Sequence, residues 1–137
     1  MTRVAVSGAA GRMGALVAAA VHAGSGLELA ACYDPAGDGE VAGVPVSADP
    51  SSVDDSAVVV EFTTPDVVMG NLARWREKGI HAVVGTSGFD DARLAALREQ
   101  WGNGPPNCLV VPNFSIGAVL MMRFAELAAP LFDTVEI

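Results

Sequence analysis

The feature that most constrains the fold is an apolar run that ends in glycines and continues as a helix pattern. Residues 3–7 (RVAVS) are apolar and β-rich, as in a buried strand. The turn GAAGRMG follows, with glycines at 8, 11 and 14. Apolar side chains then recur at helical spacing up to about Ala23: Met13, Leu16, Val17, Ala20 and Val21. A strand, a glycine turn and a helix in this order predict the first unit of a parallel sheet.

The same alternation repeats along the chain. We predict further strands at 27–33, 57–62, 81–84 and 108–111, a short extended piece at 44–47, and helices at about 65–78, 90–101 and 116–131. The strands are apolar throughout, as in sheets that are covered on both faces. The expected fold class is α/β, a Rossmann-type doubly wound parallel sheet with helices on both faces. Residues 134–137 (TVEI) alternate polar and apolar side chains, which predicts the start of another strand.

Composition narrows the possible partners. The chain has 137 residues, 51% of them apolar, and a formal charge of -8. The acidic balance disfavours nucleic acid and anionic membranes, since both need a basic surface. No apolar stretch reaches the roughly 18 to 20 residues that span a bilayer, and the N-terminus lacks a signal-peptide pattern, so we expect a cytoplasmic protein. Cys32 and Cys108 lie in predicted strands and lack metal-ligand spacing; we expect buried thiols and no metal site.

The glycine turn predicts a dinucleotide site. One glycine allows the tight turn, another lets the backbone approach a phosphate, and a third packs the helix on the strand; the pyrophosphate would then lie at the helix N-terminus. Asp34 ends the second strand about 20 residues beyond Gly14 and can bind the adenine ribose, which favours NAD over NADP. Arg12 could instead meet a 2′-phosphate, so the choice between NADH and NADPH stays open. The alternatives are a merely tight turn and a solvated aspartate.

Small polar residues follow three later strands, in the segments FTTPD, GTSGF and PNFSIG. They suit a ribose, a nicotinamide carboxamide and a polar substrate, although each turn could also be a simple helix cap. A catalytic acid is not evident, because His22, His81 and Lys78 do not follow strands at their carboxyl ends.

With these segments in view, the chain resembles the 4-hydroxy-tetrahydrodipicolinate reductase (dihydrodipicolinate reductase) family of the diaminopimelate route to lysine. The resemblance rests on RVAVSGAAGRMG, EFTTPDVVMGNL, GIHAVVGTSGF and VVPNFSIGAVLMMRFAELAA, and runs through nearly the whole chain. Three positions depart from the family pattern: Glu61 and Ser87 stand where the family usually has Asp and Thr, and Pro35 stands where some members carry an arginine for the 2′-phosphate.

The resemblance implies roles for particular residues. The pyrophosphate loop corresponds to Gly8, Ala9, Ala10, Gly11, Arg12 and Met13, and the ribose ligand to Asp34. Phe62 and Thr63 belong to the same cofactor site. Gly85, Thr86 and Ser87 would contact nicotinamide and substrate, with Thr86 anchoring a substrate carboxylate. Val111, Pro112, Asn113 and Phe114 would close over the nicotinamide.

The family is also one of two-domain enzymes, which as full-length proteins would be homotetramers acting on a small dicarboxylate. Residues 1–133 correspond to the dinucleotide-binding domain, and 134–137 to the start of a substrate and oligomerisation domain that this chain does not contain. The catalytic histidine and lysine are expected beyond Ile137, so the chain alone should be inert. Two alternatives remain: a stand-alone NAD(P)-binding module, whose apolar Val119, Met121, Met122 and Phe124 would need a partner, or the N-terminal half of another dehydrogenase, such as a sugar or amino-acid oxidoreductase.

Overall fold

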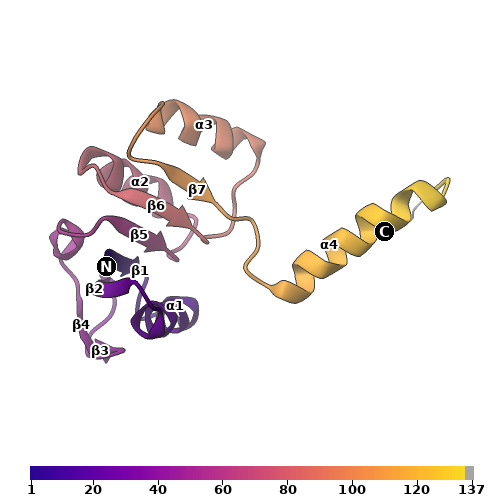
Figure 1. Ribbon diagram of the computed structural model, residues 1–137. Helices are drawn as coiled ribbons and strands as arrows, with labels where there is room; N and C mark the ends of the chain where they lie inside the picture. The colour runs from indigo at the N-terminus through magenta and orange to yellow at the C-terminus, as the bar shows by residue number, and fades with distance from the viewer. Residues whose placement is uncertain (135–137) are drawn as a thin grey trace.

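A seven-stranded sheet forms the centre of the computed structural model, which describes residues 1–134 (Figure 1). The strands are β1 (Thr2–Ser7), β2 (Leu27–Tyr33), β3 (Glu40–Val41), β4 (Val44–Ser47), β5 (Val58–Glu61), β6 (His81–Val84) and β7 (Cys108–Val110). Their order is β3-β4-β2-β1-β5-β6-β7, and every neighbouring pair is parallel except β3 and β4. The predicted α/β fold class is confirmed. Of the strand expected at 134–137, residues 135–137 lie outside the described residues.

Helices lie on both faces of this sheet. The helices of the chain are α1 (Arg12–Ala23), α2 (Val68–Glu77), α3 (Asp91–Trp101) and α4 (Ile116–Ala128), with short 3-10 helices η1 (Pro50–Val53) and η2 (Ala129–Leu131), and the first three cover the sheet (Figure 1). Figure 1 shows α1 on one face and α2 and α3 on the other. Each face has its own core, because strand side chains alternate between faces. Leu72, Trp75 and Trp101 fill the core under α2 and α3, while Ala18 and Val21 fill the core under α1.

The helix expected to begin at Pro65 begins three residues later, at Val68. The backbone N–H groups of Val67 and Val68 both donate to the carbonyl of Thr64, so the chain makes a tight turn before the helix. The carbonyl of Pro65 accepts a hydrogen bond from Arg93 Nη1 on α3, at 3.0 Å. In a helix that began at Pro65, this carbonyl would accept a hydrogen bond from within the helix. Here it accepts one from α3 instead.

The sheet also carries an edge strand that the sequence did not predict. β3 pairs antiparallel with β4 through a two-residue turn at Ala42 and Gly43, both with positive φ. Asn-Gly is the sequence pattern that marks such hairpins, and this turn has alanine, which rarely adopts a positive φ, in place of the asparagine. The sequence therefore carried no signal for the turn. At the other end of the chain, the last α-helix stops at Ala128 and not at Leu131, since Pro130 lies in a separate 3-10 turn.

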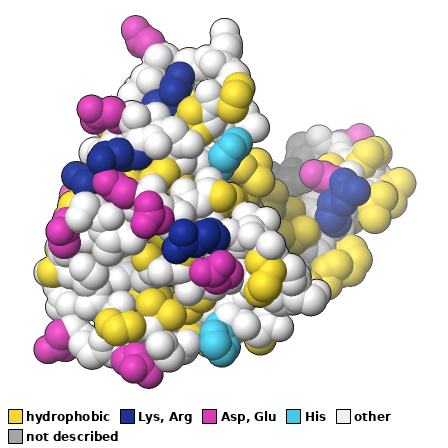
Figure 2. Space-filling view, turned by 60° about the vertical axis from the view of Figure 1, so that its left-hand side comes forward, with side chains coloured by type: hydrophobic (Ala, Val, Ile, Leu, Met, Phe, Trp, Pro, Cys, Tyr) yellow, Lys and Arg dark blue, Asp and Glu magenta, His cyan; other side chains and the backbone are white. Residues whose placement is uncertain are grey.

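The last helix does not return to the sheet. Figure 1 shows α4 running away from the body of the molecule, and none of its thirteen residues is buried. Ile116 is 78% exposed and Leu127 is 75% exposed. Figure 2 shows hydrophobic side chains spread over this projecting part. The apolar helix foreseen from the sequence is thus present with its apolar side chains uncovered. Among residues 1–134 we find no helix long and apolar enough to cross a membrane.

The two thiols give the first testable prediction. Cys32 is buried and Cys108, expected to be buried, is only partly so. Burial raises the pKa of both thiols above the ordinary value, that of Cys108 to about 11. At pH 8 only about one Cys108 in a thousand is then the reactive thiolate. We expect little reaction of the native protein with Ellman's reagent at pH 8, and two thiols per chain in guanidinium chloride. Fast titration of a thiol in native buffer would contradict this packing.

Candidate functional site

The candidate site lies at the carboxyl edge of the sheet, where the strand order reverses. β1 pairs with β2 on one side and with β5 on the other. The loops that follow β1 and β5 therefore leave the sheet side by side and run in opposite directions. In open α/β sheets such a crevice is where ligands bind. The segments that we singled out after each strand meet at this edge.

The glycine loop is tightly packed against its neighbours. The N–H groups of Gly8 and Ala9 both donate to the carbonyl of Tyr33, at 2.9 and 3.2 Å. Gly8 has φ +81°, and a Cβ there would lie 2.7 Å from the carbonyl carbon of Phe62. A Cβ on Gly14 would lie 2.7 Å from the carbonyl carbon of Gly8. Only glycine fits at these two positions, which agrees with a tight turn at the first and helix packing at the last.

The N-terminus of α1 is chemically suited to an anion. Its N-cap is Gly11, which has no side chain to cap the helix, and its first turn holds no acidic residue. Unpaired backbone N–H groups and the helix dipole together favour negative charge at such an end. The loop and the helix start therefore fit a phosphate group. Gly11, Arg12 and Met13 lie at this point of the chain, as the sequence predicted.

Asp34 follows β2 and lies beside the glycine loop. Its Oδ2 accepts a hydrogen bond from the N–H of Ala10 at 3.1 Å, and its Oδ1 accepts one from the N–H of Ala36 at 3.0 Å. The carboxylate is thus held next to the phosphate-binding candidate. This is where a residue that recognises an adenine ribose would have to lie.

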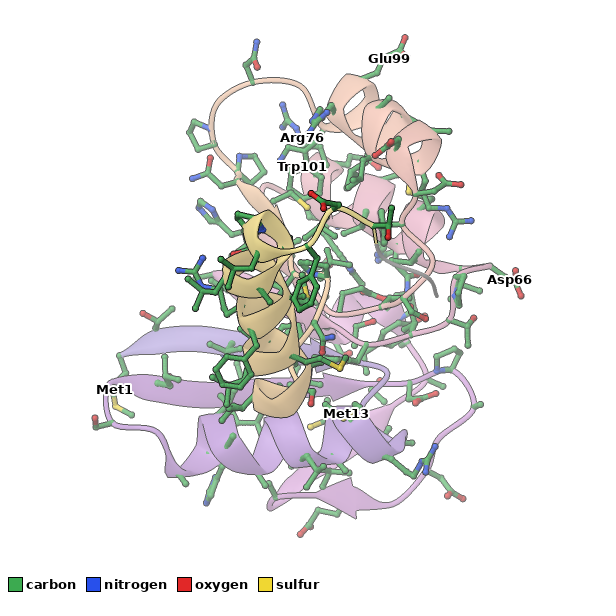
Figure 3. The ribbon with its side chains drawn as sticks, turned by 90° about the vertical axis from the view of Figure 1, so that its right-hand side faces the viewer. Met1, Met13, Asp66, Arg76, Glu99 and Trp101 are labelled. Atoms are coloured by element: carbon green, nitrogen blue, oxygen red, sulfur yellow. The ribbon has the colours of Figure 1, made fainter. Side chains whose placement is uncertain are left out.

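A cavity of about 460 Å³ opens on the other side of the glycine loop. Its lining comes from the start of α1 and from the loops after β5, β6 and β7: Met13, Phe62, Gly85, Pro112, Asn113, Phe114 and Ser115. Six of these seven residues were predicted from the sequence, and Ser115 was not. Figure 3 shows Met13 at the start of α1, on the same side of the molecule as the base of α4. The structure therefore gathers segments that are distant in sequence around one hollow.

Two aromatic rings shape this cavity. Phe62 and Phe114 pack with their ring centroids 5.1 Å apart at a tilt of 57°. A Cβ on Gly85 would lie 2.8 Å from Cε2 of Phe114 and still closer to the ring of Phe62. The absence of a side chain at Gly85 is what lets both rings approach the backbone closely. An apolar slot with a few polar groups at its rim suits a planar heterocycle.

The remaining predicted residues lie close to this cavity but do not line it. Thr86, Ser87 and Val111 line a smaller cavity of about 210 Å³ beside α3, which shares Pro112 with the larger one. Thr86 is only 5% exposed, and its hydroxyl donates to the carbonyl of Glu61 at 3.3 Å. The hydroxyl of Thr63 donates to the carboxylate of Glu61. In this state neither threonine directs its hydroxyl into the larger cavity, so their roles toward cofactor or substrate stay predictions.

Sequence reasoning gave Glu61 no role beyond a departure from the family pattern, and it did not consider Arg93. Glu61 is fully buried at the end of β5. Arg93 links the loops after β5 and β6, because its guanidinium bonds the Pro65 carbonyl and lies 5.8 Å from the ring of Phe89. An acid at the end of the run AVVVE was a usable signal, since an ionisable residue in a buried strand needs partners. Arg93 carried no comparable signal on a surface helix.

The three possible proton donors lie away from the cavity. His81 begins β6, and its Nδ1 accepts a hydrogen bond from the N–H of Asn107 at 2.9 Å. Lys78 ends α2 and pairs with Asp54 at 2.6 Å. His22 lies in the last turn of α1. In residues 1–134 we also find no group of three His, Cys, Asp or Glu side chains that could hold a metal.

Comparison with known proteins gives the family. Residues 2–114 match the family model described as "Dihydrodipicolinate reductase, N-terminus". The chain belongs to the dihydrodipicolinate reductase family. The matched region is the nucleotide-binding part of these reductases. The assignment made from the sequence is thereby confirmed at the level of the family.

Individual members of the reductase family agree over the whole chain. The chain is 49% identical over 138 aligned positions to the 4-hydroxy-tetrahydrodipicolinate reductase of Cutibacterium acnes, covering 100% of this chain and 52% of that protein. The enzyme of the same name from Thermobifida fusca is 51% identical at the same coverage. Among solved structures, a dipicolinate-bound dihydrodipicolinate reductase from Paenisporosarcina matches with a TM-score of 0.73 and 33% identity, covering 96% of this chain and 55% of that one. The chain spans about half the length of the curated relatives it matches.

Proposed function

We propose that this chain supplies the NADH- or NADPH-binding part of an enzyme that reduces 4-hydroxy-tetrahydrodipicolinate to tetrahydrodipicolinate in lysine biosynthesis. The observation that carries the proposal is the joining of two features at one sheet edge. A glycine loop opens α1, and directly beside it lies an aromatic cavity built from the loops after β5, β6 and β7. Membership of the reductase family supports the choice of substrate.

The residues present fit a dinucleotide laid across this edge. The N-terminus of α1 would hold the pyrophosphate, Asp34 the adenine ribose, and the cavity lined by Phe62 and Phe114 the nicotinamide. The bound nicotinamide supplies a hydride to a planar carbon of the substrate. The protein's own task is to orient that ring and to exclude water from one of its faces, for which two aromatic side chains over a glycine are suited.

The substrate would bind next to the nicotinamide, and the proton donor would lie outside this chain. Thr86 and Ser87 lie beside the nicotinamide slot, where their hydroxyls could bind a carboxylate of a small dicarboxylic substrate after a change of rotamer. His22, His81 and Lys78 lie away from the cavity, and the family resemblance implies a histidine and a lysine outside this chain as the source of the proton. We therefore expect the chain to bind cofactor without turnover. The full-length enzyme would be cytoplasmic, as expected from the sequence, and a homotetramer, as the family resemblance implies.

The test is a binding measurement on the purified chain. Titration followed by nicotinamide fluorescence and by calorimetry should give a saturable complex with NADH, NADPH or both. ADP-ribose, which lacks the nicotinamide, should bind more weakly at the same site. A chain that is folded by circular dichroism but binds none of these compounds would refute the proposal. Rapid oxidation of cofactor by the chain with substrate would refute the expectation that it is inert.

Asp34 provides a prediction about cofactor preference. A carboxylate at the ribose binds hydroxyls but repels a 2′-phosphate. Asp34→Ser should therefore raise the affinity for NADPH relative to NADH by about tenfold, which corresponds to about 1.4 kcal/mol. Asp38→Ser, at an exposed position in the same loop, is the matched control and should leave the ratio unchanged. An identical ratio in both variants would place the adenosine elsewhere.

A further inference from the structure

Glu61 is an acid in a place where an apolar side chain would be expected. It ends β5, is 0% exposed, and ranks with Trp75, Leu72 and Ile80 among the largest fully buried side chains. Its neighbours in the sheet are Ser7 on β1 and Val84 on β6. Burying a carboxylate costs free energy unless hydrogen bonds replace its water. The hydrogen-bond partners of Glu61 therefore indicate which segments the buried carboxylate holds in place.

The carboxylate is satisfied entirely by neutral donors from two directions. From α2, Trp75 Nε1 donates to Oε2 at 2.9 Å and Asn71 Nδ2 donates to Oε1 at 3.0 Å. These two residues are four apart and so lie on one face of the helix. From the loop after β5, the hydroxyl of Thr63 donates to Oε1. No ion pair within residues 1–134 involves Glu61.

The main chain of the same residue holds the next loop. The carbonyl of Glu61 accepts hydrogen bonds from the N–H of Gly85 at 2.9 Å and from the hydroxyl of Thr86 at 3.3 Å. One residue thus fixes both the loop that carries Phe62 and the loop that begins with Gly85. Those two loops contribute Phe62 and Gly85 to the lining of the aromatic cavity.

We propose that Glu61 is a positioning residue for the nicotinamide end of the cofactor site, acting through Thr63 and the loop that presents Phe62. This assignment rests on the proposed cofactor function and adds a residue that would not itself touch the cofactor. A buried carboxylate is rarely the most stabilising choice for a core position. The carboxylate does give a fixed geometry. Asn71 and Trp75 on the rigid helix α2 orient it, and it in turn holds Thr63 and the loop after β5.

The decisive variant is Glu61→Gln. Trp75 Nε1 can only donate, so the amide oxygen must face Trp75 and the amide NH₂ must face Thr63. The volume is unchanged, but the charge-assisted bond from Thr63 is lost. Thr63 could only accept a neutral hydrogen bond from the amide NH₂, which would also face the donor Asn71 Nδ2, so the loop is held less firmly. We expect the affinity for NADH or NADPH to fall about tenfold, while the affinity for ADP-ribose, which lacks the nicotinamide, stays within about twofold of wild type.

Trp75→Phe is the matched control on the helix side. It removes a donor from the same carboxylate but leaves the bond between Glu61 and Thr63 in place. It should lower the melting temperature and leave the NADH affinity unchanged.

Should Glu61→Gln fail to fold, the variants Thr63→Val and Thr63→Ser test the same contact, since only valine removes the hydroxyl. The valine variant alone should show the tenfold loss.

Calorimetric titrations of the 137-residue chain and these variants separate the possibilities. A selective loss of nicotinamide-dependent affinity in Glu61→Gln, absent from Trp75→Phe, supports the assignment. Equal losses for NADH and ADP-ribose, or no loss at all, would overturn it and leave Glu61 with a role in stability only. Wild-type chain that binds neither compound would refute the proposed cofactor function, and this assignment with it.

Discussion

Gly14→Ala should abolish measurable dinucleotide binding and lower the free energy of unfolding by about 3 kcal/mol, at the upper end of the range for overpacking a core. The added Cβ would lie 2.7 Å from the carbonyl carbon of Gly8 and 2.9 Å from Cα of Ala9. Both atoms belong to backbone, and the loop that carries them is bonded to the end of β2. Helix α1 would have to move away from the glycine loop, and the phosphate-binding N-terminus would move with it.

Gly70→Ala is the control for this prediction. Gly70 is also a helical glycine, in α2, but a Cβ there meets nothing within 4 Å. Alanine favours a helix over glycine by about 0.5 to 1 kcal/mol, so this variant should be slightly more stable than wild type and bind cofactor normally. Urea unfolding and NADH titration of both variants give the comparison. If Gly14→Ala were as stable and as active in binding as Gly70→Ala, the packing of α1 against the loop would be wrong.

The sequence predicted the strands better than the turns between them. The predicted strands at 27–33, 44–47 and 81–84 match the structure residue for residue. They are rich in apolar or β-branched residues bounded by Gly, Pro or Asp, a signal that depends only on neighbouring residues. The start of α2 was wrong because Arg93, distant in sequence, takes up the Pro65 carbonyl. A local pattern cannot contain that contact.

At the candidate site, too, the sequence predicted the segments that meet but not the contacts that depend on packing. The rule that loops follow the carboxyl ends of parallel strands predicted which segments would meet, and Phe62, Gly85 and Phe114 do meet. The direction of each side chain was not predictable in this way. Thr63 and Thr86 were expected to face a ligand, yet their hydroxyls bond Glu61. Glu61 was noticed only as a departure from the family pattern, because the number of its hydrogen-bond donors depends on the packing of α2.

The exposed face of α4 was partly foreseen for a physical reason. A helix that is apolar nearly all round must be covered by something. The sequence showed this need but not the path of the chain, because the covering surface is not part of the helix. In the structure Val119, Met121, Met122 and Phe124 are all more than two-fifths exposed. Relatives about twice as long offer more chain than residues 1–137 contain.

Gly85→Ala should weaken the binding of NADH or NADPH about a hundredfold and leave the fold intact. The added Cβ would overlap the ring of Phe62 and lie 2.8 Å from Cε2 of Phe114. These atoms are the ends of side chains that can rotate, so the strands need not move, in contrast to the backbone clash at Gly14. The rings would instead swing into the 460 Å³ cavity and fill the space proposed for the nicotinamide. Overpacking of 1 to 3 kcal/mol corresponds to a loss of up to about a hundredfold.

ADP-ribose again separates the two ends of the site, since it should bind Gly85→Ala as it binds wild type. Gly117→Ala is the matched control, because Gly117 lies in the first turn of α4 near the cavity and a Cβ there meets only Ser115 Oγ, at 3.8 Å. That variant should bind NADH normally. Fluorescence titration with NADH and calorimetry with ADP-ribose measure both effects. Normal NADH binding by Gly85→Ala would mean that the nicotinamide lies outside the cavity lined by Phe62 and Phe114. An equal loss of both ligands would mean that Gly85 acts on the whole sheet edge.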